Sequence, residues 1–245
     1  LSDYDNEDIQ LRFRFASDAS QDNYEGWYID DVTVTNGAQT LFSDDFSKGA
    51  ERWEIGAGKW EVKNGQYVQT TTDVFLSSFV KSKHWDPKLT QYTLELKAMK
   101  LGGKEGWDIV FGIGSDNKVP AVKGDRSSMT FYDWNIAGDG NTRSVLRKRV
   151  KGKNSNIVDA TVGNTVENNK WYKIKIEVSP NKTVGFIDGK KGFEVKEGPQ
   201  NGRIGFSLFG TSAAFDDVTV YDTDGPSAVS RSMKLATKWS QIKQP

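Results

Sequence analysis

The 245-residue chain contains no cysteine and only one histidine, His84. The absence of cysteine excludes disulfide bonds, thiolate nucleophiles and cysteine-ligated zinc. His84 lies in the run Lys83-His84-Trp85-Asp86, and no recognisable nucleophile motif surrounds it. Nothing in the sequence therefore indicates a catalytic triad or redox chemistry.

Net charge and long apolar runs are also missing. Lysine plus arginine and aspartate plus glutamate both number 33, so no overall field attracts nucleic acid. No run approaches the about 18 apolar residues of a membrane span. Residues 1–5 lack the basic start and apolar core of a signal peptide. We expect no nucleic-acid partner, no membrane insertion, and an internal piece of a longer precursor.

Short runs of β-branched and aromatic residues are what the sequence does contain. Residues 92–98, 171–178 and 183–187 alternate with period two, which is typical of strands with one buried face. Asn-Gly or Asp-Gly pairs at 64–65, 188–189 and 201–202 predict three hairpins. With no long amphipathic helix before residue 225, the pattern predicts an all-β sandwich.

Two segments have the form expected of a sandwich's last strand. Gly26–Val34 and Ala214–Val220 each combine an aromatic residue, an aspartate pair and a β-branched strand. Residues 1–36 would supply only about two strands, which cannot bury a core by themselves. We therefore expect an incomplete module at 1–36, a complete sandwich at 37–224, and a tail or linker at 225–245.

Two resemblances agree with this division. Residues 11–15 and 26–32 resemble the end of the jelly-roll modules attached to secreted bacterial metallopeptidases. Lys100–Gly106 and Tyr132–Arg143 resemble parts of the laminin-G-like domain appended to family 51 α-L-arabinofuranosidases, a similarity that runs over much of 41–222 without the catalytic barrel. The resemblance implies a concanavalin A-like (laminin-G-like) jelly-roll sandwich with an extra N-terminal strand pair.

Sugar recognition needs aromatic faces and polar side chains, and both occur near the family-like motifs. The ligand-binding candidates are Trp107, Asp133, Trp134, Asn135, Asp139, Asn141 and Arg143. Alternation places Tyr132, Trp134 and Ile136 on one strand face, which favours the core for Trp134, and Asp133 with Asn135 on a solvent face. The arabinofuranosidase domains usually have tryptophan where this chain has Asp133 and Asp139. We therefore expect sugar contacts from polar side chains more than from aromatic rings at these positions.

Catalysis and a basic ligand site are both disfavoured. A glycosidase needs two carboxylates across the scissile bond, but Glu105 and Asp108 are three apart and would face opposite sides of a strand. The segment 145–153 is strongly basic, and one interpretation of it is a site for uronic acid or for an acidic partner. A solvated face is the more common role of such a run.

A structural calcium ion is the metal site that the sequence suggests. First and last strands of such sandwiches often lie side by side, which would bring Asp44 and Asp45 near Asp216 and Asp217. Carboxylate and backbone oxygens are the ligands that Ca²⁺ prefers. The alternative is that these aspartates only end strands and solvate turns.

Three functions are compatible with these observations. The favoured one is a non-catalytic carbohydrate-binding module of a larger secreted or cell-surface protein, with a polysaccharide or glycan as partner. The second is a structural protein that joins copies of itself by strand addition through the N-terminal strands and the tail. The third is the C-terminal fragment of a secreted peptidase.

Overall fold

The structure is a computed structural model that describes residues 12–14, 39–114 and 129–222. The chain divides into two units, Leu1–Val34 and Thr35–Pro245. The strands expected in 1–36, apart from residues 12–14, and the tail at 225–245 lie outside the described residues. The assembly and peptidase readings, which depend on those segments, stay predictions.

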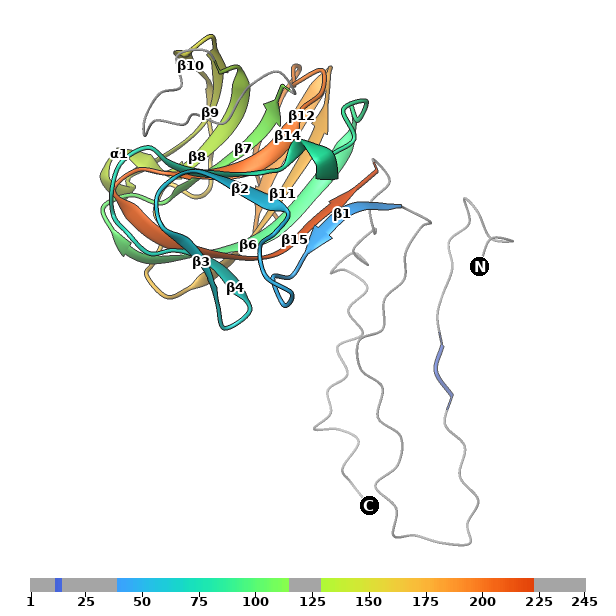
Figure 1. The fold of residues 1–245 in the computed structure, drawn as a ribbon. Helices are drawn as coiled ribbons and strands as arrows, with labels where there is room; N and C mark the ends of the chain where they lie inside the picture. The colour runs from blue at the N-terminus through green and yellow to red at the C-terminus, as the bar shows by residue number, and fades with distance from the viewer. Residues whose placement is uncertain (1–11, 15–38, 115–128, 223–245) are drawn as a thin grey trace, which may run out of the picture. The chain divides into compact units, whose positions relative to one another are not determined.

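Two antiparallel sheets stack face to face (Figure 1). The eight-stranded sheet has the order β13 (Lys190–Val195), β12 (Lys182–Ile187), β11 (Trp171–Ser179), β6 (Tyr92–Gly103), β15 (Thr211–Tyr221), β4 (Gln66–Gln69) and β3 (Trp60–Lys63), with β1 (Thr40–Asp44) also paired to β15. Asp44 stands opposite Val218 in the β1–β15 register, which confirms that the first and last described strands are neighbours.

The seven-stranded sheet completes the sandwich. Its order is β10 (Lys153–Asp159), β9 (Arg143–Val150), β8 (Phe131–Ala137), β7 (Trp107–Ile113), β14 (Arg203–Leu208), β5 (Leu76–Val80) and β2 (Trp53–Ala57). Two short helical turns interrupt the strands, η2 (Ser82–His84) and α1 (Gly138–Asn141). The described residues thus form the all-β jelly-roll sandwich that the alternating pattern predicts.

Stacked aromatic rings join the two sheets. Phe206 on β14 stacks on Phe215 of β15 at 3.9 Å and on Trp53 of β2 at 4.9 Å between ring centroids. All three side chains are buried. Since Phe206 and Phe215 belong to different sheets, their contact packs the two sheets against each other.

Two of the three predicted hairpins are confirmed. The pairs Asn64-Gly65 and Asp188-Gly189 connect β3 to β4 and β12 to β13, with positive φ at both residues of each pair. The third prediction is wrong, because residues 201–202 lead from β13 in one sheet to β14 in the other. There the need for glycine is steric: a Cβ at Gly202 would lie 2.4 Å from the carbonyl carbon of Gly112.

We predict that Phe206→Ala lowers the free energy of unfolding by about 3–5 kcal/mol, because it leaves a cavity between the stacked rings. Urea unfolding followed by tryptophan fluorescence measures the change. Ile55→Ala on β2, where the side chain is 51% exposed, is the control and should cost well under the core variant. A loss below about 1 kcal/mol for Phe206→Ala would contradict the inter-sheet role.

Candidate functional site

The outer face of the seven-stranded sheet, turned away from the other sheet, has a polar half and an apolar half. One row of paired residues crosses the sheet through Ser77, Ser207, Asp108, Asn135 and Val145. The next row begins with Phe79 and Val110, which belong to a second small apolar cluster, and continues on β8 and β9 to Asp133 and Arg147. The polar half is therefore the part of this face with chemistry to examine.

Arg147 on β9 joins two aspartates of neighbouring strands. Its Nε donates to Asp133 Oδ2 at 2.7 Å, and its Nη2 donates to Asp108 Oδ1 at 3.0 Å. Asn135 Nδ2 also donates to Asp108 Oδ1, at 2.6 Å. The side chains of Asp108 and Asp133 are only 8% and 2% exposed. We call these four residues the Arg147 network.

Electrostatics hold the Arg147 network in its charged form. Burial alone would lower the pKa of Arg147, but the charges of Asp108 and Asp133 outweigh it and raise that pKa above its ordinary value. The network corrects two sequence predictions. Asp133 and Asn135 do face away from Trp134, yet this face is buried rather than solvated. Within the basic segment, Arg147 is only 20% exposed, whereas Lys151 and Lys153 are exposed, so a solvated face describes only part of it.

Glu105 interacts electrostatically with Asp108 and Arg147 of the network. Glu105 precedes β7 in a turn, so strand alternation does not apply to it. Burial raises its pKa, and the charges of Asp108 and Asp139 raise it further, while a hydrogen bond from the Gly140 amide lowers it. Glu105 thus connects the network to the turn that follows β8.

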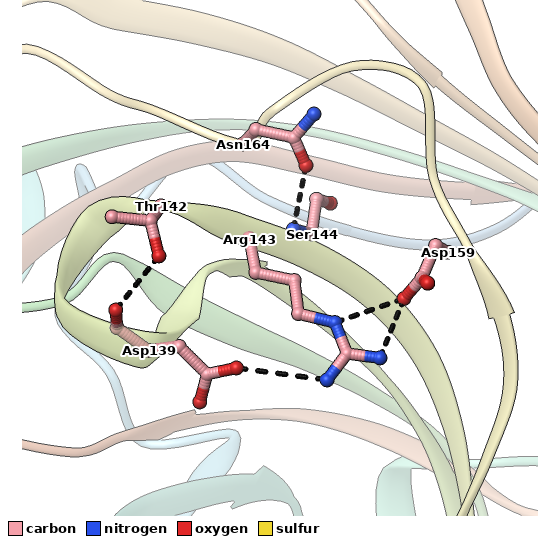
Figure 2. A network of polar contacts seen from close by, with 6 residues as sticks. All are labelled: Asp139, Thr142, Arg143, Ser144, Asp159 and Asn164. Atoms are coloured by element: carbon pink, nitrogen blue, oxygen red, sulfur yellow. Dashed lines mark hydrogen bonds and ion pairs between the residues drawn. The ribbon is translucent and has the colours of Figure 1, made fainter.

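The turn between β8 and β9 carries the exposed candidates. Figure 2 shows the Arg143 guanidinium between Asp159 and Asp139. Its Nε and Nη2 donate to Asp159 Oδ1 at 2.9 and 2.7 Å, and Nη1 lies 3.6 Å from Asp139 Oδ2. Asn141 has a structural task, since its side chain exchanges two hydrogen bonds with the backbone of Val166.

Glycine is needed where this turn leaves β8. A Cβ at Gly138 would lie 2.0 Å from Asn135 Oδ1, so the turn packs directly on the Arg147 network. Ala137, Asp139 and Asn141 all have positive φ. The exposed polar groups of the turn therefore have a fixed position, because the turn packs on the Arg147 network beneath it.

The two tryptophan candidates are not available to a ligand. Trp107 is 1% exposed and Trp134 is fully buried, with its Nε1 donating to Ser144 Oγ at 2.9 Å. Trp134 also packs edge-on against Phe193, 4.9 Å between ring centroids. Both rings lie in the core between the sheets, as alternation favoured for Trp134.

The aspartates proposed for calcium divide into pairs with different partners. Both oxygens of Asp44 accept hydrogen bonds, from the Phe46 amide and from Trp53 Nε1, each at 3.0 Å. Asp217 forms an ion pair with Lys97. Burial raises the pKa of Asp216, and the negative charge of Asp45 contributes to the shift.

Within the described ranges, no three acidic, histidine or cysteine side chains group closely enough to hold a metal ion. The calcium site at Asp44, Asp45, Asp216 and Asp217 therefore stays a prediction. In the part of the chain that the structure describes, no helix has the length and apolar character of a bilayer span.

Sequence reasoning missed several residues of this region. Arg147 and Asp108 meet only through the β7–β8–β9 register, and Asp159 reaches Arg143 from the neighbouring strand β10. A signal was present in the basic segment, whose alternate residues Arg147 and Arg149 share a face. Arg149 packs over the ring of Phe131 at 5.5 Å.

Comparisons with known proteins agree on the class of fold. The chain resembles carbohydrate binding module CBM66 from Bacillus subtilis, with a TM-score of 0.54, 15% identity, and coverage of 70% of this chain and 96% of that one. It also resembles a Bacillus subtilis protein described as having a galectin-like fold, with a TM-score of 0.56, 12% identity, and coverage of 78% and 98%. A Bacillus licheniformis β-glucanase has a TM-score of 0.52 at 12% identity, with coverage of 77% and 99%. These similarities establish a jelly-roll sandwich.

One sequence relative is an extracellular exo-α-L-arabinofuranosidase from Streptomyces chartreusis, 34% identical over 169 residues. The match covers 68% of this chain but only 18% of that enzyme's length. No family model matches the chain. The similarity is thus to a segment of the larger enzyme.

We predict that Arg147→Met lowers the free energy of unfolding by about 3–5 kcal/mol, since it leaves two buried carboxylates without their cation. Chemical denaturation measures the loss. Arg143→Met is the matched control, because the Arg143 side chain is 39% exposed and its ion pairs are solvated, so its cost should stay within about 1 kcal/mol. Equal losses in the two variants would contradict the distinction.

The calcium prediction is tested by thermal unfolding in millimolar CaCl₂ and in EDTA. A bound ion should raise the unfolding midpoint, because a ligand that binds only the native state stabilises it. Asp216→Asn should remove that rise, whereas Asp188→Asn, in the β12–β13 turn, should retain it. Identical midpoints with and without calcium would refute the site.

Proposed function

We propose that this chain is a non-catalytic carbohydrate-binding module of a larger extracellular protein. The sandwich fold is shared with a carbohydrate binding module, and a segment of an extracellular arabinofuranosidase is 34% identical. Both findings support a role in attaching a polymer-active protein to its polysaccharide. The ligand class, glycan, follows from these relatives together with the exposed polar groups beside α1.

The observation that carries binding over hydrolysis is the Arg147 network. Glycoside hydrolysis uses two carboxyl groups about 5–10 Å apart, one donating a proton and one acting as base or nucleophile. Asp108 and Asp133 are both buried and both paired with Arg147. Neither is placed to take up a proton or to attack a sugar, and the exposed carboxylates Asp139 and Asp159 both form ion pairs with Arg143.

Affinity electrophoresis of the full chain in gels containing arabinan, xylan or β-glucan tests the proposal. We expect retardation by at least one neutral polysaccharide and no release of reducing sugar from it. Free migration with every polymer would refute the binding role. Release of reducing sugar that disappears in Glu105→Gln would refute the non-catalytic assignment.

A further inference from the structure

Two phenylalanine rings are exposed at one end of the seven-stranded sheet. Phe75 directly precedes β5 and Phe209 directly follows β14, and they are 41% and 42% exposed. Their rings meet edge to face with centroids 5.2 Å apart. The two rings together present apolar surface to solvent, and aromatic surface of this kind is suited to contact a ligand.

The backbone of Phe75 strengthens this interpretation. Its φ is +56°, in the left-handed region that a bulky L-residue rarely adopts. Glycine would occupy this conformation with less strain. The core residue Phe46 has the same conformation, with a φ of +55°, so what sets Phe75 apart is that its ring is held this way at the surface.

The aromatic pair lies beside Glu105. The Lys104 amide donates to the Gly210 carbonyl at 2.9 Å, and the Glu105 amide donates to Thr211 Oγ1 at 2.9 Å. Thr211 Oγ1 in turn donates to the Glu105 carbonyl at 2.6 Å. The turn that carries Phe209 is therefore fixed against the segment that carries Glu105.

The sheet register places Arg143 at the same end of the seven-stranded sheet as the aromatic pair. Phe75 and Phe209 are two residues beyond Ser77 and Ser207 on their chains, and Arg143 is two residues beyond Val145, the far end of the same polar row. Three interstrand steps separate β14 from β9, which is about 14 Å at the usual strand spacing. We call this line the rim; it consists of the Phe75–Phe209 pair, Lys104 and Glu105, and Arg143 with Asp139 and Asp159.

The rim has aromatic rings at one end and charged side chains at the other, and a sugar chain has groups that pair with each. Aromatic faces accept the apolar C–H side of a sugar ring, whereas carboxylates and a guanidinium pair with its hydroxyls. The side chains of Arg143 and Asp159 are 39% and 67% exposed, so their remaining hydrogen-bonding positions reach solvent. The rim's carboxylates, Glu105, Asp139 and Asp159, outnumber its cations, Lys104 and Arg143, which disfavours a polyuronate.

We propose that the rim binds a neutral polysaccharide as an extended chain, with sugar rings on Phe75 and Phe209 and hydroxyls hydrogen-bonded to Glu105, Asp139 and Arg143. This inference rests on the proposed function and adds where the polymer lies, that it is neutral, and that several sugar units are held at once. Affinity should therefore rise with oligosaccharide length.

The test is isothermal titration calorimetry with the neutral polysaccharide that retards the protein in electrophoresis, and with its oligosaccharides of one to six units. Phe209→Ala and Arg143→Ala should each weaken binding about tenfold. Phe75→Gly should weaken binding similarly while leaving the free energy of unfolding unchanged or higher, since it removes strain together with the ring. Phe186→Ala, an aromatic change on β12 of the other sheet, is the matched control and should bind like the parent chain.

The outcomes separate this inference from the proposed function. Parent protein that binds no polysaccharide refutes both. Parent protein that binds, with rim variants of unchanged affinity, refutes the rim and leaves the proposed function standing. A single sugar unit that binds as tightly as the hexamer refutes the extended chain, and tighter binding of polygalacturonate than of any neutral polymer refutes the ligand class.

Discussion

The ion pairs of Arg147 with Asp108 and Asp133 are the constraint on which the outer face of the seven-stranded sheet depends. Two carboxylates with almost no exposure to water require a cation nearby, because unpaired buried charge is costly. The three residues stand on consecutive strands β7, β8 and β9, so the pairing also fixes how these strands meet. Asn135 extends the network to the turn at Gly138, which packs against its side-chain oxygen.

That constraint separates charged groups with a structural task from charged groups available to a ligand. The buried pairs neutralise the centre of the face, while Arg143, Asp139 and Asp159 remain exposed on the turn above it. The exposed groups keep a defined geometry because the turn is anchored below by glycine and by the Asn141 bonds to Val166. A rigid base under solvated polar groups favours binding, because little ordering is required when the ligand arrives.

The jelly-roll sandwich is compatible with many functions, so the similarity in fold carries less weight than the site. The solved structures share 12% to 15% identity with this chain, and they include a binding module and a glucanase. The proposal of binding rather than hydrolysis rests on two observations of side chains, namely the aspartates paired with Arg147 and the exposed Phe75 beside Phe209. Neither follows from the fold.

The sequence by itself determined the strand alternation, the burial of Trp134, and the β3–β4 and β12–β13 hairpins, because period-two patterns and Asn-Gly or Asp-Gly pairs act over a few residues. The expectation that β1 and β15 would be neighbours came from the usual layout of such sandwiches rather than from the residues themselves. Only the tertiary structure decided that Arg147 pairs with Asp108 and Asp133, that residues 201–202 cross between sheets, and that Phe75 meets Phe209. These contacts join residues far apart in the chain through strand order and register, which local patterns do not encode.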